Sequence, residues 1–360
     1  MKYVFAVVLA IHGIIHLIGF SKAFGLSKVT QLTKEISKPA GAVWLAVTLL
    51  FLITMALLLL KNDRWWMIGL TAAILSQVLI FMVWKDAKFG TIPNLLMLAV
   101  AFFCFNIAAF EKTYEKDVRE NLQTNNSLAT EILTESDIQA LPRPVQRYLR
   151  YAGALNKPKV KNMRVEFAVQ MRGKGKEFVA YTSEQYNFFA EPTRLFFMKG
   201  KMFGLDISGY HRFSKGSATM DIRLLGLVKV VNQSGPVLDK TETVTLFNDM
   251  CLMAPATLID KRIQWQEIDN NSSRAFFTSR GITVSATLFF NDEGQLVDFA
   301  SNDRTEVTEM KQLPFFTPVS DYKNINGMNI WTRGEAVWQY PDGKFTYGKF
   351  VLKNISYNCD

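Results

Sequence analysis

The sequence predicts an α-helical membrane segment of four spans, followed by a mainly antiparallel β domain that forms a curled sheet or half-barrel around a buried apolar helix. Of the 360 residues, 49% are hydrophobic and only 20% are charged. The mean hydropathy of +0.08 is high for a soluble protein of this length. Beyond Lys159, hydrophobic and polar residues alternate, which is typical of strands. These observations predict lipid-embedded helices first and a sheet second.

The positive charge belongs mainly to the membrane segment. The formal net charge is +9; residues 1–110 hold nine basic against three acidic side chains, and residues 111–360 hold 32 against 29. Two thirds of the surplus therefore lie in short loops between apolar stretches, as expected for cytoplasmic loops of a membrane protein. This distribution argues against nucleic-acid binding.

Four stretches contain no Asp, Glu, Lys or Arg, and each is long enough to cross about 30 Å of hydrocarbon as a helix. They are Tyr3–Ser21, Pro39–Leu60, Trp65–Trp84 and Phe89–Phe110. Tryptophans with flanking basic residues at several ends indicate the headgroup level. The first stretch has the alternative of a cleaved signal peptide, which its length and its two histidines argue against.

The loop charges predict the orientation of the spans. The first and third loops carry six lysines between them and are expected in the cytoplasm, so the chain after Phe110 emerges on the other side. Three basic residues lie just past the last span and make the number of positive charges equal on the two sides: Lys112, Lys116 and Arg119. Cleavage of the first stretch would reverse the predicted orientation. The orientation therefore stays open from the sequence, with the β domain expected outside the cytoplasm.

His12 and His16 are a polar pair inside the first span. Four residues apart, they share one helix face, and polar groups at that depth face a bundle interior or a cavity. One interpretation is a ligand pair for haem or a metal, or a proton relay. The favoured interpretation is hydrogen bonding between helices, because no third strong ligand stands out. The candidate partners are Ser76, Gln77, Asn94 and Asn106.

Residues 111–133 are charged and polar, and predict a solvated helix or linker that leaves the bilayer. A helix start at Thr134 and a C-cap at Gly153 then bound a short helical region. We therefore divide the chain into a four-helix transmembrane anchor (1–110), this polar linker or helix, and an α+β, mainly antiparallel β domain (134–360).

Eight segments rich in β-branched and aromatic residues predict strands. They are residues 164–173, 177–189, 193–204, 218–226, 282–292, 295–303, 335–340 and 345–358. Turn signals lie at 173–175, 214–216, 291–294 and 341–343. Short turns join neighbouring strands, so we expect an antiparallel sheet of about ten strands, and a sheet of that size curls or closes.

The segment 245–259 breaks the strand pattern. Asn248 or Asp249 is the expected N-cap of a nearly all-apolar helix, which must be buried because no face suits water. We expect it inside the curled sheet or across its mouth, where it would enclose a cavity or complete a filled core. The candidate ligand-binding residues of this helix and the cavity rim are Phe247, Met250, Leu252, Met253, Leu258, Arg223 and Arg304.

No other segment carries a strong catalytic or metal-binding motif. His211 is the only histidine outside the spans, and without a GxSxG elbow an exposed strand histidine is favoured over a hydrolase base. Cys251 and Cys359 could form a disulfide outside the cytoplasm, although Cys251 in an apolar helix is favoured as a small hydrophobic residue. We predict no catalytic residue and no cofactor, and leave metal binding open.

The order of elements resembles the lipoprotein-carrier (LolA-like) half-barrel. A leading helix, a long antiparallel sheet interrupted by an apolar helix, and the closing pair WTRGEAVWQYPDGKFTYGKFVLKNISYN carry this resemblance. The strings AYTSEQYNFF, TVTLFNDMCLMAPATLID and VDFASNDR are similar to an uncharacterised family of bacterial membrane proteins, over most of residues 135–358. These resemblances imply a membrane-tethered β domain able to hold an acyl chain, with no catalytic residue to transfer. LolA-like carriers shuttle as soluble proteins, whereas four spans would fix this chain.

The sequence therefore predicts a multi-pass protein of the bacterial cytoplasmic membrane whose extracytoplasmic β domain binds a lipid or another apolar ligand, with no need for catalysis. The expected partners are the bilayer and that ligand, without nucleic acid and with any protein partner unidentified. The alternative is a membrane enzyme or a redox or metal-binding protein that uses His12 and His16. A structural partner of another membrane protein is a third possibility.

Overall fold

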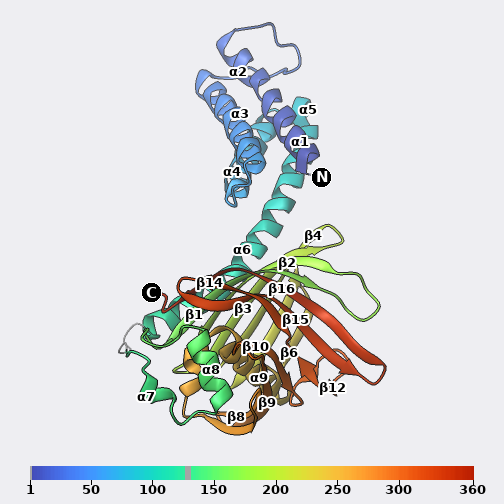
Figure 1. The fold of residues 1–360 in the computed structure, drawn as a ribbon. Helices are drawn as coiled ribbons and strands as arrows, with labels where there is room; N and C mark the ends of the chain where they lie inside the picture. The colour runs from blue at the N-terminus through green and yellow to red at the C-terminus, as the bar shows by residue number, and fades with distance from the viewer. Residues whose placement is uncertain (1, 126–130) are drawn as a thin grey trace. The chain divides into compact units, whose positions relative to one another are not determined.

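The computed structural model describes residues 2–125 and 131–360 (Figure 1). The chain divides into two compact units, Met1–Ala108 and Ala109–Asp360.

The first unit is helical. Its elements are α1 (Lys2–Ile15), α2 (Leu17–Phe24), α3 (Lys38–Leu59), α4 (Trp65–Met82), α5 (Trp84–Ala87), η1 (Lys88–Gly90) and the first part of α6 (Thr91–Asn125). Within the described residues, four helical segments are long and apolar enough to cross a membrane: Lys2–Phe24, Lys38–Leu59, Trp65–Met82 and Trp84–Asn125. The four apolar stretches of the sequence are therefore helical, and membrane association follows from their length and composition.

Small residues let these helices approach closely. A Cβ atom on Gly19 would lie 2.1 Å from Cδ2 of Trp44, and one on Gly13 would lie 2.8 Å from Cβ of Phe51. Neither distance is sterically possible without a shift, so glycine is required where α1 and α2 meet α3. The faces turned away from these contacts expose Val7 and Ile11, as expected of helices surrounded by lipid.

Helix α6 does not end with its apolar stretch. It continues to Asn125, and Phe110, Tyr114 and Val118 are buried against aromatic and aliphatic side chains of the sheet, among them Phe197 and Tyr210. Of the expected polar linker 111–133, the part up to Asn125 is thus a helix packed on the β domain, and 126–130 lie outside the described residues. The β domain begins with this helix rather than after it.

In the described part of the second unit, fourteen strands form one sheet in the order β6-β5-β4-β3-β2-β1-β16-β15-β13-β10-β9-β8-β7, with β14 also paired to β15. The bounds are β1 (Asn162–Met171), β2 (Val179–Phe188), β3 (Thr193–Met202), β4 (Leu205–Ser214), β5 (Ser217–Leu224), β6 (Val228–Ser234), β7 (Ile263–Asp269), β8 (Ser272–Ser279), β9 (Ile282–Phe290), β10 (Leu296–Ser301), β13 (Phe315–Phe316), β14 (Val319–Ile325), β15 (Met328–Tyr340) and β16 (Gly343–Tyr357). Strands β11 (Thr305–Glu306) and β12 (Lys311–Gln312) form a separate small pair.

The sheet is antiparallel and curled, as the sequence predicts, and within the described residues it does not close into a barrel, because β6 and β7 are its two ends. The predicted turns are confirmed: Ser214 pairs with Ser217 across Lys215 and Gly216, which both have positive φ, and Tyr340 pairs with Gly343. The expected ten strands were too few, because β6, β7, β8 and β14 carry many polar residues that obscure the alternation.

Two short helices precede the sheet. Helix α7 (Glu135–Ile138) begins with a capping box at Thr134, and α8 (Arg143–Tyr151) follows it. Tyr148 of α8 is fully buried, and its hydroxyl donates to the carbonyl of Cys251 over 3.0 Å. This contact ties α8 to the central helix.

The central helix α9 (Pro236–Met253) lies within the curl of the sheet (Figure 1). The predicted N-cap at Asn248 or Asp249 is wrong, because the helix starts at Pro236 after Gly235. Asn248 and Asp249 lie in the interior of the helix. Proline suits a first helical turn, and the polar residues that follow hid the helical pattern. The apolar run also does not form one helix, because α9 ends at Met253 and the 3-10 helix η2 (Pro255–Ile259) follows.

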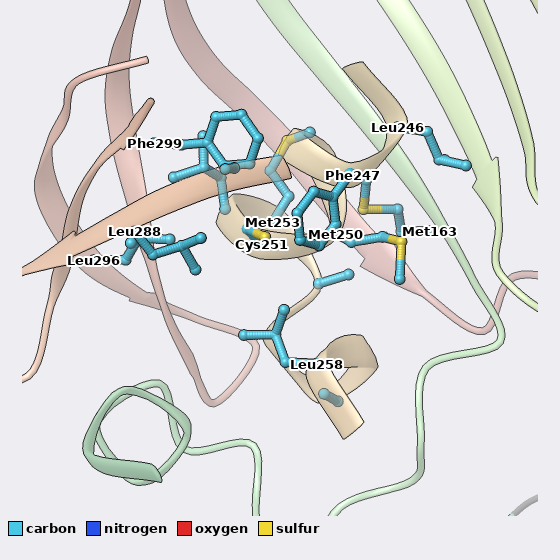
Figure 2. Close-up of a cluster of buried hydrophobic side chains, with 14 of the residues drawn as sticks. Met163, Leu246, Phe247, Met250, Cys251, Met253, Leu258, Leu288, Leu296 and Phe299 are labelled. Carbon is cyan, nitrogen blue, oxygen red and sulfur yellow. The ribbon is translucent and has the colours of Figure 1, made fainter. Parts of the chain in front are cut away.

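One side of α9 completes a filled core. Figure 2 shows Phe247, Met250 and Cys251 of α9 packed among side chains of the sheet. The Phe247 ring stacks on Phe277 with centroids 5.2 Å apart and meets Phe299 edge-on at 5.8 Å. The buried location expected for the apolar helix is therefore observed.

Candidate functional site: a cavity between the sheet and helix α9

The other side of α9 borders a cavity of about 450 Å³. This volume falls within the range of about 300–1,000 Å³ found for small-molecule sites. Much of its wall is aromatic or methionine, including Phe167, Met198, Met220, Trp331 and Trp338. Both alternatives that the sequence left open therefore occur together, with a filled core on one side of α9 and an apolar cavity on the other.

The aromatic wall is held in place by contacts with α9. The rings of Phe167 and Trp331 stack with centroids 5.8 Å apart and an interplanar angle of 13°. The indole nitrogen of Trp331 donates to the carbonyl of Leu252 over 2.9 Å, and the Tyr357 hydroxyl donates to that of Met253 over 2.5 Å. These bonds to the last turn of α9 fix the shape of the wall.

One end of the cavity is polar because Arg194 of β3 is buried there. Its guanidinium donates to Asp249 Oδ2 over 2.8 Å, to Glu242 Oε2 over 3.2 Å and to Gln185 Oε1 over 2.9 Å. Asn187 also donates to Asp249, over 3.0 Å. Although burial lowers the pKa of Arg194, the charges of Asp249 and Glu242 raise it overall, so the guanidinium stays charged.

His211 and Arg304 lie in the same lining and lack such partners. Among the described residues, neither Nε2 of His211 nor Nε of Arg304 has a hydrogen-bond partner, and both atoms are buried. Burial lowers the pKa of His211 to about 4, so its ring is neutral at physiological pH. The expected exposed strand histidine is instead a cavity residue.

The exposed part of the lining marks the mouth of the cavity. Gly173 and Lys174 belong to the β1–β2 turn, and Thr308 and Glu309 to the loop between β11 and β12. The mouth therefore lies at the edge of the sheet that carries the β1–β2 turn. The last turns of α9 form the closed end.

The structure brings three of the seven sequence-predicted ligand residues into this lining: Leu252, Met253 and Arg304. Phe247, Met250 and Leu258 belong to the filled core. Arg223 is absent from the described lining; its Nη2 donates to Asp221 over 2.6 Å, and its guanidinium lies 4.3 Å from the centroid of the Phe110 ring.

Sequence reasoning missed Arg194, Glu242 and Asp249. A signal for Arg194 exists in the sequence, because this charged residue lies in β3 directly before the apolar run LFFM. A charge beside such a run needs a buried partner. Which carboxylates supply it depends on the distant helix α9, and no local pattern reveals them.

In the first unit, His12 and His16 belong to a hydrogen-bonded network. His12 Nε2 donates to Asn94 Oδ1 over 2.9 Å, His16 Nε2 lies 2.8 Å from Ser76 Oγ, and Asn94 donates to Gln77 Oε1 over 3.0 Å. The favoured hydrogen-bonding interpretation is confirmed for these partners, whereas Asn106 bonds within its own helix. Across residues 2–125 and 131–360, His, Cys, Asp and Glu form no group of three or more able to hold a metal.

Cys251 and Cys359 are not joined by a disulfide. Cys251 is fully buried on α9, and burial raises the pKa of its thiol well above the usual value. It acts as a small hydrophobic residue in the core.

Comparison with known proteins identifies a family for this chain. The model of a family of unknown function, DUF6544, matches residues 131–350. No curated protein matches the sequence. Among solved structures, a LolA superfamily protein from Nitrosomonas europaea is similar at 10% identity and a TM-score of 0.36, covering 59% of this chain and 93% of that chain. The expected resemblance to an uncharacterised family is thus confirmed by the family model.

Proposed function

The chain belongs to the family of unknown function DUF6544, and we propose that it is a membrane-tethered binding protein for a lipid or another apolar ligand, with its β domain outside the cytoplasm of a bacterium. The observation that carries this proposal is the cavity of about 450 Å³ with its aromatic and methionine wall. Protein cores normally pack with few voids larger than a water molecule. A hollow of this size with an apolar wall is typical of binding sites.

The edge of the sheet that bears the mouth also receives helix α6. The β1–β2, β3–β4 and β5–β6 turns share this edge, because Tyr181 pairs with Gly200 and Ile207 with Leu224. Near it, Lys199 Nζ donates to Glu111 Oε1 over 2.5 Å. Glu111 is the first charged residue after the last apolar stretch of the sequence.

The same edge of the sheet also exposes apolar side chains. Two apolar side chains project there: Phe203 at the tip of the β3–β4 hairpin is 95% exposed, and Val228 at the start of β6 is 58% exposed. Apolar exposure of this kind marks contact with a membrane or partner.

The alternative, a membrane enzyme or redox protein that uses His12 and His16, has less support. The hydrogen bonds of both rings to Ser76 and Asn94 give these histidines a structural role, and no further observation favours chemistry there.

A cavity-filling variant tests the proposal. Met220 of β5 lines the cavity, whereas its neighbour Thr219 is exposed. The full chain, purified in a mild non-ionic detergent, is extracted with organic solvent and the lipids are quantified by mass spectrometry. We expect about one specific lipid or apolar molecule per chain in the wild type and in Thr219→Trp, and its loss in Met220→Trp. Identical extracts from all three proteins would remove the support for a binding cavity.

A further inference from the structure

The lining of the cavity holds a cation without an anion. The guanidinium of Arg304 lies 4.0 Å from the centroid of the Phe315 ring and 5.3 Å from that of Trp338. Among the described residues it makes no ion pair, and its buried Nε has no hydrogen-bond partner. An arginine can only donate hydrogen bonds, so this site lacks an acceptor.

The carboxylates nearby are already engaged. Asp249 and Glu242 accept from Arg194, and Asp303, next to Arg304 in the sequence, accepts from Lys240 over 2.8 Å and from Ser285. Two further carboxylates belong to the lining: Glu306 accepts from the backbone N–H of Glu309, and Glu309 pairs with Lys311. None of these described carboxylates is paired with Arg304, so a bound ligand can supply the acceptor that it needs.

His211 offers a second polar contact in the same lining. Its ring packs edge-on against Phe196 with centroids 5.6 Å apart, and the charged groups that act on it are Glu242, Arg194 and Arg304. A neutral imidazole donates from one nitrogen, so His211 can share an oxygen ligand with Arg304. Both residues are thus free to bind one head group at the polar end of an apolar cavity.

We infer that the cavity takes a long-chain carboxylate, whose apolar chain lies against the methionine and aromatic wall and whose carboxylate accepts hydrogen bonds from Arg304 and His211. This inference rests on the proposed binding function and specifies its ligand class. A carboxylate fits better than an ester, because it both accepts the hydrogen bonds and neutralises the charge of Arg304. The negative charge of Glu242 does not prevent this, since Glu242 is bound to Arg194.

Photolabelling of the full chain tests the inference. A palmitic acid that carries a diazirine and its methyl ester serve as probes in a non-ionic detergent, and labelled peptides of β3 and β5 are measured by mass spectrometry against probe concentration. We expect the acid to label these peptides at a concentration about tenfold or more below that of the ester, the size expected for a charge-assisted hydrogen bond.

Four variants assign this preference to its residues. Arg304→Gln should raise the half-saturating concentration of the acid about tenfold and leave that of the ester unchanged, and Arg304→Lys should retain part of the preference. Arg333→Gln is the matched control, because Arg333 is 68% exposed and outside the cavity. His211→Phe, which keeps an aromatic ring of similar shape, should weaken labelling by the acid alone and gives a second test if Arg304→Gln fails to fold.

The outcomes separate the two proposals. Equal labelling of β3 and β5 by acid and ester, unchanged in Arg304→Gln and His211→Phe, would overturn the carboxylate site and leave the binding function standing. Absence of labelling at β3 and β5 by either probe would overturn both.

Discussion

Arg194 and Asp249 form a buried ion pair that joins β3 to α9, with Nε and Oδ2 separated by 2.8 Å and side chains only 9% and 8% exposed. The same oxygen of Asp249 accepts from Gln185 of β2 over 2.7 Å. The pair therefore holds the central helix at a fixed distance from two strands. The cavity wall depends on this distance, because Leu252 and Met253 follow Asp249 by one turn.

Removal of the Asp249 charge should destabilise the β domain. Asp249→Asn leaves a buried guanidinium with one carboxylate fewer, and loss of one partner of a buried ion pair costs about 3 kcal/mol or more. Thermal unfolding of the full chain should show a clearly lower melting temperature. Asp206→Asn is the control, because Asp206 and its partner Lys201 are exposed, and it should change stability by less than about 0.5 kcal/mol. Equal stability of Asp249→Asn and the wild type would contradict the proposed role of the pair.

The neutral state of His211 predicts a pH dependence. Burial lowers its pKa to about 4 in the folded chain, against an ordinary value of 6.5. Between these values the unfolded chain binds more protons, so the contribution of His211 to stability is complete above pH 6.5 and is lost as the pH falls toward 4. The wild type should therefore lose more stability than His211→Phe between neutral pH and about pH 4. Parallel pH profiles of the two proteins would contradict burial of this ring.

The tip of the β3–β4 hairpin should contact lipid. A fluorophore at Phe203→Cys, in a background without Cys104 and Cys359, should be quenched by nitroxide-labelled lipids after reconstitution into bilayers. Ile268→Cys is the matched control, because Ile268 is exposed on strand β7 at one end of the sheet. Quenching at residue 268 but not at residue 203 would contradict contact of this hairpin with lipid.

The polar network of the first unit should stabilise the helix bundle. Asn94 bonds to His12, Ser76 and Gln77, and interhelical hydrogen bonds in membranes contribute about 0.6 kcal/mol each on average. Asn94→Ala should therefore destabilise the purified protein by about 1–2 kcal/mol, with no change in its absorption spectrum. Asn106→Ala, which removes a bond within one helix, should have a smaller effect. A haem band in the wild type that Asn94→Ala alters would favour the redox alternative.

The membrane helices and most hairpins were predictable because their signals are local. An uncharged run of about twenty residues is sufficient for a span, and the turn at 214–216 contains its own glycine. Strands β6 and β7 lie at the two ends of the sheet, and each carries polar residues on both faces. The alternation of hydrophobic and polar residues is therefore weak in these strands, as in the sequence IQWQEID of β7.

The polar end of the cavity was not predictable because its parts are distant in the sequence. Arg194 contacts Glu242 and Asp249, which lie some fifty residues further along the chain. The first half of α9 is rich in polar residues, so the apolar pattern did not predict it as part of the helix. Alternation placed Tyr210 and His211 on opposite faces of β4, but only the curl of the sheet determines which of them faces the cavity. Arg304 was found as a rim candidate because an arginine beside a strand suggests anion binding, and Arg223, chosen on the same grounds, pairs with Asp221 instead.

An electron-microscopy or crystal structure of the full chain, purified from its own membrane without added lipid, would show directly whether the cavity holds a ligand. We expect elongated density in the cavity beside Met198 and Met220, with its polar end against Arg304 and His211. A cavity that is collapsed, or filled only by ordered water, would contradict the claim that this domain binds an apolar ligand.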